Sequence, residues 1–466
     1  MIKRYNIETG HAVETGHAPS QQHVFLIAVL LLGAQTANAR RILTYDDYIK
    51  NVREKNIEYI VEQYNVSIAE ANTQAAKVFP DPEITFSYEN NQDRTMQMGQ
   101  SYVTELGYTL ELGGKRRARM AVARSEQQIT EALVEDFFRN LRADATLCYL
   151  EALKQKQLVA LALSSYQNMR DLARADSLRH ALGEIAEVDA MQSRLEATTM
   201  MTDFLQAEVE YKNMLSDLVV FMGGTMENVE TGRAPSPTMP GENLDIEMGY
   251  VIETGRAIET GHAPSLQYRE YQLPYLVEIA LDNRADLQAV IRSRELSAAN
   301  VRLAKANRVI DLGLNIGFAH NTIVINEIAP APRHQSVSAG FSIPLKFSNT
   351  NKGALRAAQF SAQQAEAVYD AVLLQIRKEV EQCYNSYVSA YLQAELYQNS
   401  TLTDATSILE KKKYSYSRGE TSLFEVLDAQ RTANEVFQNY YEALYNANAS
   451  LVELCRAAGI WEIELF

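Results

Sequence analysis

The chain has 466 residues, 46% of them hydrophobic, and a formal net charge of −15 at pH 7. Only 21 glycines and 11 prolines interrupt this length, which favours long helices over many short elements. An acidic chain lacks the basic surface that phosphate backbones require, so no nucleic-acid partner is expected. The three cysteines, Cys148, Cys383 and Cys455, are an odd number, which argues against a disulfide framework, and Cys148 and Cys383 are interpreted as small core hydrophobes.

The first 39 residues have the features of a secretory signal peptide. Positive residues precede an apolar core at residues 23–32, and Ala37-Asn38-Ala39 is a cleavage sequence of the A-x-A type. The apolar core is short for a membrane-spanning helix, although a short membrane anchor is the alternative. We therefore expect residues 1–39 to be removed on export.

A helix is expected over residues 42–78, because apolar residues recur there at helical spacing. Pro80 and Pro82 end it. Its apolar positions are Ile57, Ile60, Val61, Tyr64, Ile68 and Ala71.

Two pairs of alternating segments are expected to form strands. Residues 83–88 and 101–112 form the first pair, and residues 312–318 and 337–345 form the second, each joined by a polar loop. Alternating segments of about ten residues are typical of hairpins in transmembrane barrels. Four strands cannot close a barrel, and open strand edges are not tolerated in lipid. We therefore expect a barrel shared between chains.

A long helical region follows each strand pair, at residues 117–222 and 352–458. Each is broken once, at Gly183 and at Gly419, so each reads as an antiparallel helical hairpin. A helix of about 50 residues is ~75 Å long and needs packing along its length, as in a coiled coil. The expected apolar seams are Val188, Met191, Leu195, Met200 and Leu205 in the first hairpin, and Val426, Leu427, Ala433, Val436, Tyr440, Leu444 and Leu451 in the second.

The same succession of patterns therefore occurs twice, and a repeat of this length is a structural half rather than a solenoid unit. The patterns align Asn56 with Asp286. We expect a first repeat at residues 40–223, an equatorial connection at 224–275 and a second repeat at 276–466. The connection carries copies of a Glu-Thr-Gly-x-Ala phrase that also occurs near the N-terminus, and this phrase is interpreted as an insertion in exposed chain.

The order of these elements resembles the TolC-type outer-membrane efflux proteins, over nearly the whole mature chain. One local motif, Gly113-Gly114-Lys115-Arg116 after the second strand, resembles the barrel exit of the heavy-metal branch of that family, the CzcC/CusC-like factors. Residues 343–353 resemble the second exit of the same branch more loosely.

In this family the segment that matches residues 416–430 is the periplasmic tip, where two acidic positions line the entrance as rings. They fall on Glu425 and Asp428, which are three residues apart and so share one side of a helix. Carboxylates around a narrow mouth favour cations. A solvated helix face is the alternative interpretation of both residues.

The resemblance also assigns a gate to the tip. Tyr416 matches the family's tyrosine, but Thr421 stands where the TolC prototype has an arginine, and Arg418 is hypothesised to substitute for it. Together with Gly419, and with Gly183 in the first half, these residues are expected to form the periplasmic tip.

The resemblance implies a mixed α+β membrane protein: a homotrimer with a 12-stranded transmembrane β-barrel in outer-membrane lipid, continued by an α-helical coiled-coil periplasmic tunnel. It further implies a passive exit duct of a tripartite efflux system in a Gram-negative bacterium, fed by an inner-membrane RND-type transporter through a periplasmic adaptor (membrane fusion) protein. Heavy-metal cations, or alternatively drugs, are the implied substrates. No catalytic residues, cofactor or metal site are expected, and His180, His320 and His334 are isolated.

Two other functions stay open at the level of the sequence. One is an exit duct for type I protein secretion, which would have the same architecture. The other is a periplasmic coiled-coil scaffold without a pore. The alternating hairpins argue against the scaffold, because a soluble protein has no need of lipid-facing strands.

Overall fold

The computed structural model describes residues 41–93, 97–224, 250–252, 271–345 and 351–461. The predicted signal peptide and most of the equatorial connection, with its Glu-Thr-Gly phrases, lie outside the described residues. Two compact units are present. In the smaller unit, β1 (Arg41–Leu43) pairs in parallel with β4 (Tyr250–Ile252). The larger unit holds all the other described helices and strands.

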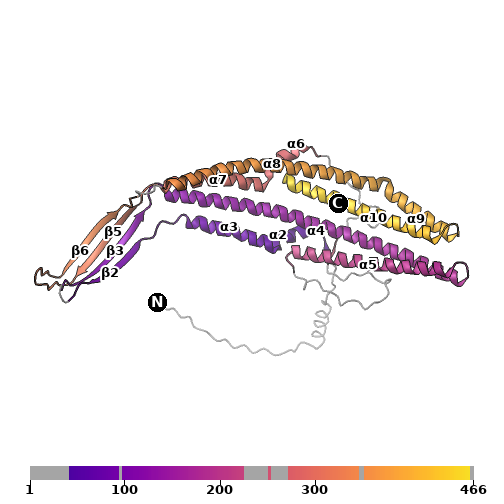
Figure 1. Ribbon diagram of the computed structural model, residues 1–466, viewed down its shortest axis with the longest axis horizontal. Helices are drawn as coiled ribbons and strands as arrows, with labels where there is room; N and C mark the ends of the chain where they lie inside the picture. Colours follow the sequence, from indigo (N-terminus) through magenta and orange to yellow (C-terminus); the bar gives the residue numbers. More distant parts are fainter. Residues whose placement is uncertain (1–40, 94–96, 225–249, 253–270, 346–350, 462–466) are drawn as a thin grey trace, which may run out of the picture. The chain divides into compact units, whose positions relative to one another are not determined.

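One order of elements occurs twice in the larger unit (Figure 1). The first half contains α2 (Tyr45–Lys55), α3 (Ile57–Ala75), β2 (Glu83–Asn90), β3 (Gln100–Leu110), α4 (Lys115–Ala181) and α5 (Glu187–Phe221). The second contains α6 (Leu273–Asn283), α7 (Ala285–Ala306), β5 (Leu312–Asn321), β6 (His334–Ser342), α8 (Lys352–Leu396), the π-helix η3 (Tyr397–Thr401), α9 (Leu402–Ser417) and α10 (Leu423–Ala458). In the part of the chain that the structure describes, no helix is long and apolar enough to cross a membrane.

Two helix predictions need correction. The helix expected over residues 42–78 is broken at Asn56, whose backbone is extended and whose Oδ1 accepts a hydrogen bond from the Tyr59 amide. An asparagine that caps a helix start in this way competes with helix continuation. The second hairpin also has a break besides Gly419, since the π-helical turn η3 separates α8 from α9.

The breaks at Asn56 and Arg284 perform the same task in the two halves. Asn56 Nδ2 donates to the carbonyl of Phe221, at the end of α5, over 3.0 Å. Arg284 Nη1 donates to the carbonyl of Ala457, at the end of α10, over 3.1 Å. Each side chain thus satisfies a helix-terminal carbonyl that has no partner within its own helix. The structural counterpart of Asn56 is therefore Arg284 and not Asp286.

The helices lie side by side in a definite order (Figure 1). Helix α4 contacts α3 on one side and α7 on the other, and α7 contacts α8. Within the two helical hairpins, α4 contacts α5 and α10 contacts α9. Helix α4 also contacts α10, which joins the two hairpins. Helices α3 and α5 therefore stand at one margin of the helical layer, and α8 and α9 stand at the other.

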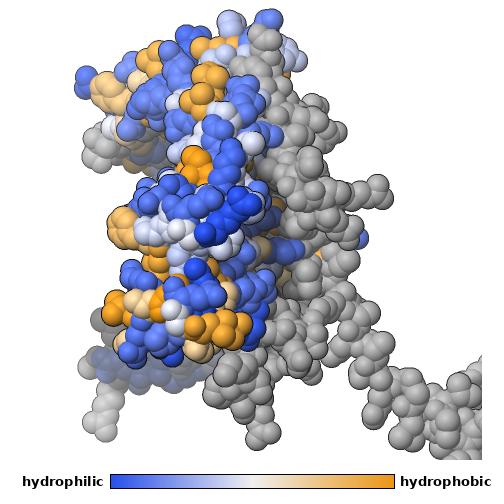
Figure 2. Space-filling view, turned by 90° about the vertical axis from the view of Figure 1, so that its right-hand side faces the viewer, coloured by the Kyte–Doolittle hydropathy of each residue, from blue (hydrophilic) through white to orange (hydrophobic). Residues whose placement is uncertain are grey.

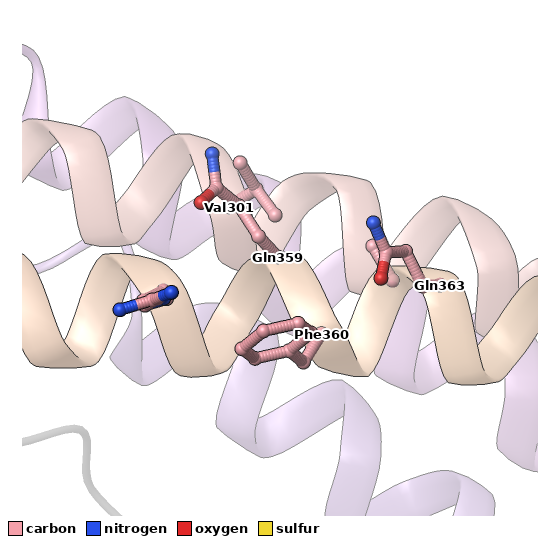
Figure 3. Close-up of a pocket in the computed structure, with 6 residues that line it drawn as sticks. Val301, Gln359, Phe360 and Gln363 are labelled. Atoms are coloured by element: carbon pink, nitrogen blue, oxygen red, sulfur yellow. The ribbon is translucent and has the colours of Figure 1, made fainter.

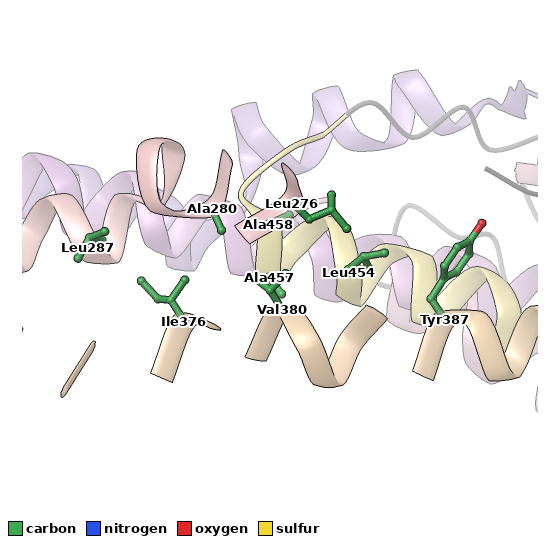
Figure 4. Close-up of a cluster of buried hydrophobic side chains, with 9 residues drawn as sticks. All are labelled: Leu276, Ala280, Leu287, Ile376, Val380, Tyr387, Leu454, Ala457 and Ala458. Carbon is green, nitrogen blue, oxygen red and sulfur yellow. The ribbon is translucent and has the colours of Figure 1, made fainter. Parts of the chain in front are cut away.

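A buried cluster lies where α6, α7, α8 and α10 meet (Figure 4). Alanines such as Ala280 and Ala458 are fully buried and allow the helices to approach closely. Cys148 and Cys383 are half-buried, in keeping with their interpretation as core residues, and burial raises the pKa of Cys148 to about 12. Cys455 is buried. The cluster consists of Leu276, Ala280, Leu287, Ile376, Val380, Tyr387, Leu454, Ala457 and Ala458.

The predicted seam of the first hairpin is wrong. Only Met200 of that seam is buried, whereas Val188 and Leu195 are exposed by 69% and 68%. The side of α5 that packs within the chain carries smaller residues, among them Ala190, Ser193 and Ala197, which permit close contact with α4. The spacing of residues in the sequence does not distinguish this face of α5 from the neighbouring face, which carries the large apolar side chains. The seam of the second hairpin is confirmed, since its members are buried or half-buried.

An ionic network lies beside the buried cluster and is centred on Arg284, which is only 5% exposed. Its guanidinium binds Asp286 through two hydrogen bonds of 3.0 and 2.6 Å, and Glu379 through one of 2.7 Å. Burial by itself would raise the pKa of Asp286, but Arg284 and the nearby Arg139 lower it below its ordinary value. The network therefore keeps charged groups in a partly buried place by pairing them.

Replacement of Arg284 by methionine is expected to lower the free energy of unfolding by about 3–5 kcal/mol, because two carboxylates would lose their buried partner. Urea unfolding followed by circular dichroism would measure the change, with R292M, at an exposed Arg–Glu pair on α7, the helix that follows Arg284, as the control. Since the folded-state pKa of Asp286 is lowered, the contribution of this carboxylate persists above its ordinary pKa and is lost as the pH falls through the lowered value. Equal losses in both variants would contradict the assignment.

Candidate functional site

The four long strands form one antiparallel sheet in the order β2-β3-β5-β6 (Figure 1). Their bounds differ slightly from those predicted. Strand β3 ends at Leu110, and β6 spans His334–Ser342 and not residues 337–345, because His334 already pairs with Asn321. Strands β2 and β6 stand at the two edges of the sheet.

One face of the sheet is apolar. The register places Ile84 opposite Leu106 and Leu106 opposite Ile316, so that large side chains of successive strands share a face. These residues are exposed in the chain, Ile316 by 60% and Phe318 by 46%. The apolar face as a whole carries Ile84, Phe86, Tyr88, Tyr102, Leu106, Tyr108, Leu110, Leu312, Leu314, Ile316, Phe318, Val337 and Phe341.

The opposite face is made mainly of small and polar residues, and in β3 and β5 it is the less exposed face. Gly317 is buried there, while its neighbours Ile316 and Phe318 are exposed. Glycines make room on this face: a Cβ at Gly317 would lie 2.6 Å from the Ser338 hydroxyl. A sheet in water normally hides its apolar face and exposes the polar one. This sheet does the reverse, which suits an apolar environment outside and water on the polar side.

The Gly-Gly-Lys-Arg motif forms the passage from β3 into α4. Gly113 and Gly114 both have positive φ, of 74° and 71°, and α4 begins at the next residue. At Gly113 a Cβ would lie 2.5 Å from the side chain of Val309, in the connection between α7 and β5. Glycine is therefore required at this position both for its backbone conformation and for the close approach.

The charged residues of the motif bind neighbouring connections. The buried Lys115 donates to Asp311 over 2.5 Å, and the Leu112 amide donates to the same carboxylate over 3.2 Å. Arg116 donates to the Lys77 carbonyl over 2.6 Å and stacks on the Phe79 ring. The motif thus ties the exit of β3 to the segments that enter β2 and β5, and its role in this chain is to hold the strand-to-helix junction.

The second junction uses a different residue for the same geometry. Asn351 precedes α8 with a left-handed φ of 54°, as Gly114 does before α4, and its side chain donates to the Asn307 carbonyl over 3.2 Å. Asparagine is one of the few residues that adopt this conformation readily. Sequence reasoning missed Asn351, although its place just before a helical run was the available signal.

G113A is expected to lower the free energy of unfolding by about 2–4 kcal/mol, because the methyl group adds overlap with Val309 to backbone strain. G114A is the matched control. It has a similar φ but open space around the new Cβ, so it should cost only about 1 kcal/mol. Urea unfolding midpoints of the two variants provide the comparison, and a G114A variant as damaged as G113A would refute the proposed overlap.

The two helical hairpins turn in the same way at Gly183 and Gly419, with φ values of 79° and 75°. In each turn the amide of a glutamate three residues beyond the helix end donates to a carbonyl of the last helical turn: Glu184 to Arg179, and Glu420 to Ser415. This pattern is a common glycine-dependent helix end. Open space surrounds both glycines, so their backbone conformation alone explains the residue type.

A buried hydrogen bond joins the two hairpins near these turns. The Tyr416 hydroxyl, from α9, donates over 2.9 Å to the carboxylate of Asp176 on α4, which is 0% exposed. Arg179 lies over the Tyr416 ring at 5.2 Å and has a guanidinium nitrogen 3.8 Å from the same carboxylate. Burial raises the pKa of Asp176, while the hydroxyls of Tyr416 and Ser193 and the charge of Arg179 oppose the rise.

Sequence reasoning found Tyr416 but missed Asp176 and Arg179. Both lie in a long, highly charged helix, and no spacing distinguishes them from the solvated charges around them. Arg418, the hypothesised gate arginine, instead contacts the Tyr414 ring and Glu420 within its own turn. In this chain the arginine that reaches Tyr416 is Arg179.

The two acidic residues predicted at the entrance are exposed, and each has a cationic partner. Glu425 pairs with Lys412 across the α9–α10 hairpin, and this hydrogen bond lowers the pKa of the carboxyl, aided by Thr421. Asp428 pairs with Arg431, one turn further along α10, over 2.7 Å. The local negative charge of the tip is therefore partly balanced within the chain.

Y416F is expected to loosen the contact between the hairpins, because Asp176 would stay buried without its principal donor, a loss of about 1–3 kcal/mol. Hydrogen exchange of the amides around residues 176–190 and 415–424 should become faster. Y414F is the control, since Tyr414 is exposed. Unchanged exchange in Y416F would show that this hydrogen bond does not hold the tip.

Exposed apolar residues also mark the marginal helices. On α3, four positions of the predicted apolar stripe, Ile57, Val61, Tyr64 and Ile68, face outward from the chain. At the other margin, α7 and α8 form an open groove of about 480 Å³ with the exposed Phe360 at its centre (Figure 3). The view toward the helical turns shows apolar patches on a mainly hydrophilic surface (Figure 2).

Among the residues that the structure describes, no group of three or more His, Cys, Asp or Glu side chains is arranged to hold a metal ion. The chain instead resembles known channels. Residues 276–460 match the family model "Outer membrane efflux protein". The cobalt-zinc-cadmium resistance protein CzcC of Cupriavidus metallidurans is 24% identical over 393 residues, which cover 84% of each chain.

The chain is similar to the outer membrane efflux protein family. The outer membrane protein TolC of Vibrio cholerae is also 24% identical, over 59% of this chain and 62% of TolC. The crystal structure of CusC has the same fold, with a TM-score of 0.67 at 17% identity over 89% of this chain and 92% of that one. These relatives are outer-membrane channel proteins and not enzymes, and this protein is located in the outer membrane of a Gram-negative bacterium, with a periplasmic extension.

Proposed function

We propose that this efflux protein is a homotrimeric exit duct for heavy-metal cations. The observation that carries the proposal is the inverted sheet, with an exposed apolar face and a less exposed polar face. Such a sheet is stable in lipid only when its polar face encloses water and its edges are paired.

The strand order supports closure by neighbouring chains. Directions alternate from β2 to β6, so β6 of one chain is antiparallel to β2 of the next. Three chains of four strands each form a 12-stranded barrel, wide enough for a water-filled lumen. The marginal helices support the same arrangement: the apolar stripe of α3 in one chain covers the groove beside Phe360 in the next. Likewise, the outward residues of α5, among them Val188 and Leu195, pack against α9 of a neighbour.

The two halves are interpreted as tandem structural repeats that occupy equivalent places in the wall. Both contain the same order of elements, the same glycine turn and the same side-chain cap at the inner helix break. Their long helices would continue the barrel as a periplasmic coiled-coil tunnel. The contact of Tyr416 with Asp176 then holds the two hairpins together at the tunnel entrance.

A duct of this kind supplies no energy. We therefore infer a tripartite system in which an inner-membrane RND-type transporter and a periplasmic adaptor deliver the substrate to the entrance. The similarity to a cobalt-zinc-cadmium resistance protein supports metal cations as the substrate class. The acidic residues Glu425 and Asp428, placed at the tip, would attract cations to the mouth.

Single-channel recording of the purified protein in a planar bilayer tests the duct. Wild type is expected to give a cation-selective conductance that divalent metals block. The double variant E425Q/D428N should reduce cation conductance, since it leaves the charges of Lys412 and Arg431 unbalanced at the mouth. K412M is the opposite control, because it frees Glu425 and should increase cation preference.

Absence of any conductance from folded protein would refute the duct and favour a scaffold without a pore. Normal conductance with unchanged selectivity in both tip variants would refute only the role of the two acidic residues. Trimers in detergent, measured by sedimentation, should persist in wild type and in both variants.

A further inference from the structure

The charged side chains of the four strands are all acidic, and they lie on one face of the sheet. The four strands contain three acidic residues, Glu83, Glu89 and Glu105, and neither lysine nor arginine. The register places all three on the polar face, where Glu83 lies opposite Gly107, Glu89 opposite Ser101 and Glu105 opposite Thr85. Glu83 and Glu89 stand at the two ends of β2, whereas Glu105 lies in the interior of the sheet on β3, between two other strands.

The position of Glu105 is held by a side chain of the next strand. Asn315 on β5 donates a hydrogen bond through Nδ2 to Glu105 Oε1. Asn315 itself occupies the space left by Gly340 on β6, where a Cβ would lie 2.8 Å from Asn315 Oδ1. On β5 the residue opposite Glu105 is Gly317, which carries no side chain to cover the carboxylate. The carboxylate is thus oriented on the polar face and left open on one side.

Its electrostatic setting differs from that of the acidic residues at the tip. Glu425 and Asp428 are each paired with a cation of the same chain. Among the ion pairs of the described residues, none involves Glu105. Asn315, which donates a hydrogen bond to Glu105, is neutral, so no cation of the described residues is paired with the negative charge of Glu105.

We propose that Glu105, positioned by Asn315, determines the cation preference of ions that pass through the strand-lined part of the duct. The proposal rests on the function proposed above, in which the polar face lines a lumen. Three chains then place three uncompensated carboxylates at one level of this lumen. The fixed charge raises the local concentration of cations and lowers that of anions, as lumen-facing residues of other barrels do.

The reversal potential of single channels in a potassium chloride gradient tests this assignment. E105Q keeps the size of the side chain and removes its charge, and is expected to lower the potassium-to-chloride permeability ratio about threefold at 0.1 M salt. The effect should grow at 0.01 M salt, because the Debye length increases from about 10 Å to about 30 Å. E105D should keep the wild-type ratio. E70Q, at an exposed glutamate of α3, is the control for loss of a carboxylate elsewhere.

A second variant separates charge from structure. E105C should resemble E105Q until it is treated with a water-soluble thiol reagent that adds a sulfonate, which should restore cation preference in the same channel. Cys148, Cys383 and Cys455 are buried or half-buried, and wild type treated with the same reagent reports any reaction there.

The outcomes separate this inference from the function on which it rests. If E105Q and unmodified E105C conduct with the wild-type permeability ratio, Glu105 does not set selectivity although the duct exists. If wild type forms no channel, both proposals fail. A loss in E105Q that E105D also shows, with no recovery after sulfonate addition to E105C, would indicate altered packing and would overturn the assignment to charge.

Discussion

Backbone hydrogen bonding in an apolar environment is the constraint on which the rest of this structure depends. The exposed face of the sheet is apolar, yet β2 and β6 end the sheet with edges that no other described strand of the chain covers. In lipid such edges are too costly to leave unpaired. The proposed trimer follows from this cost, and so does the placement of exposed apolar residues on the marginal helices α3, α5 and α8, where a soluble protein would carry charges.

The passage from strand to helix depends on a small set of close contacts. Two glycines in left-handed conformation let β3 turn directly into α4, and Lys115 with Asp311 locks this turn to the entry of β5. The second half obtains the same turn with Asn351. The motif that resembles the heavy-metal branch is thus explained by the geometry of the junction, so its presence carries little weight as evidence for a metal substrate. That evidence comes from the similarity to CzcC and from the charge of the surfaces proposed to line the duct.

Charge is distributed differently at the two ends of the proposed path. At the tip, carboxylates lie on the helix surface and are balanced by Lys412 and Arg431, while the buried Asp176 is held by Tyr416. On the polar face of the sheet, Glu105 has a neutral partner only. A balanced tip can be opened without a large electrostatic cost, whereas an unbalanced charge in a rigid sheet acts continuously on passing ions. In the proposed duct, the paired tip is therefore suited to gating as well as to attracting cations, and the charge of Glu105 in the sheet is suited to selection.

The sequence by itself determined the features that depend on local patterns. Alternation predicted the four strands, the lack of glycine and proline predicted the long helices, and glycine predicted both hairpin turns, because each of these follows from neighbouring residues. Tertiary structure alone decided the rest. The hydrogen bonds of Asp176 with Tyr416 and of Glu105 with Asn315 join residues that are far apart in the chain. The outward apolar residues of α5 lie on one of two helix faces of equal periodicity, and packing decides which face turns outward. These contacts and faces depend on which surfaces meet in the folded chain, and the spacing of neighbouring residues in the sequence does not specify them.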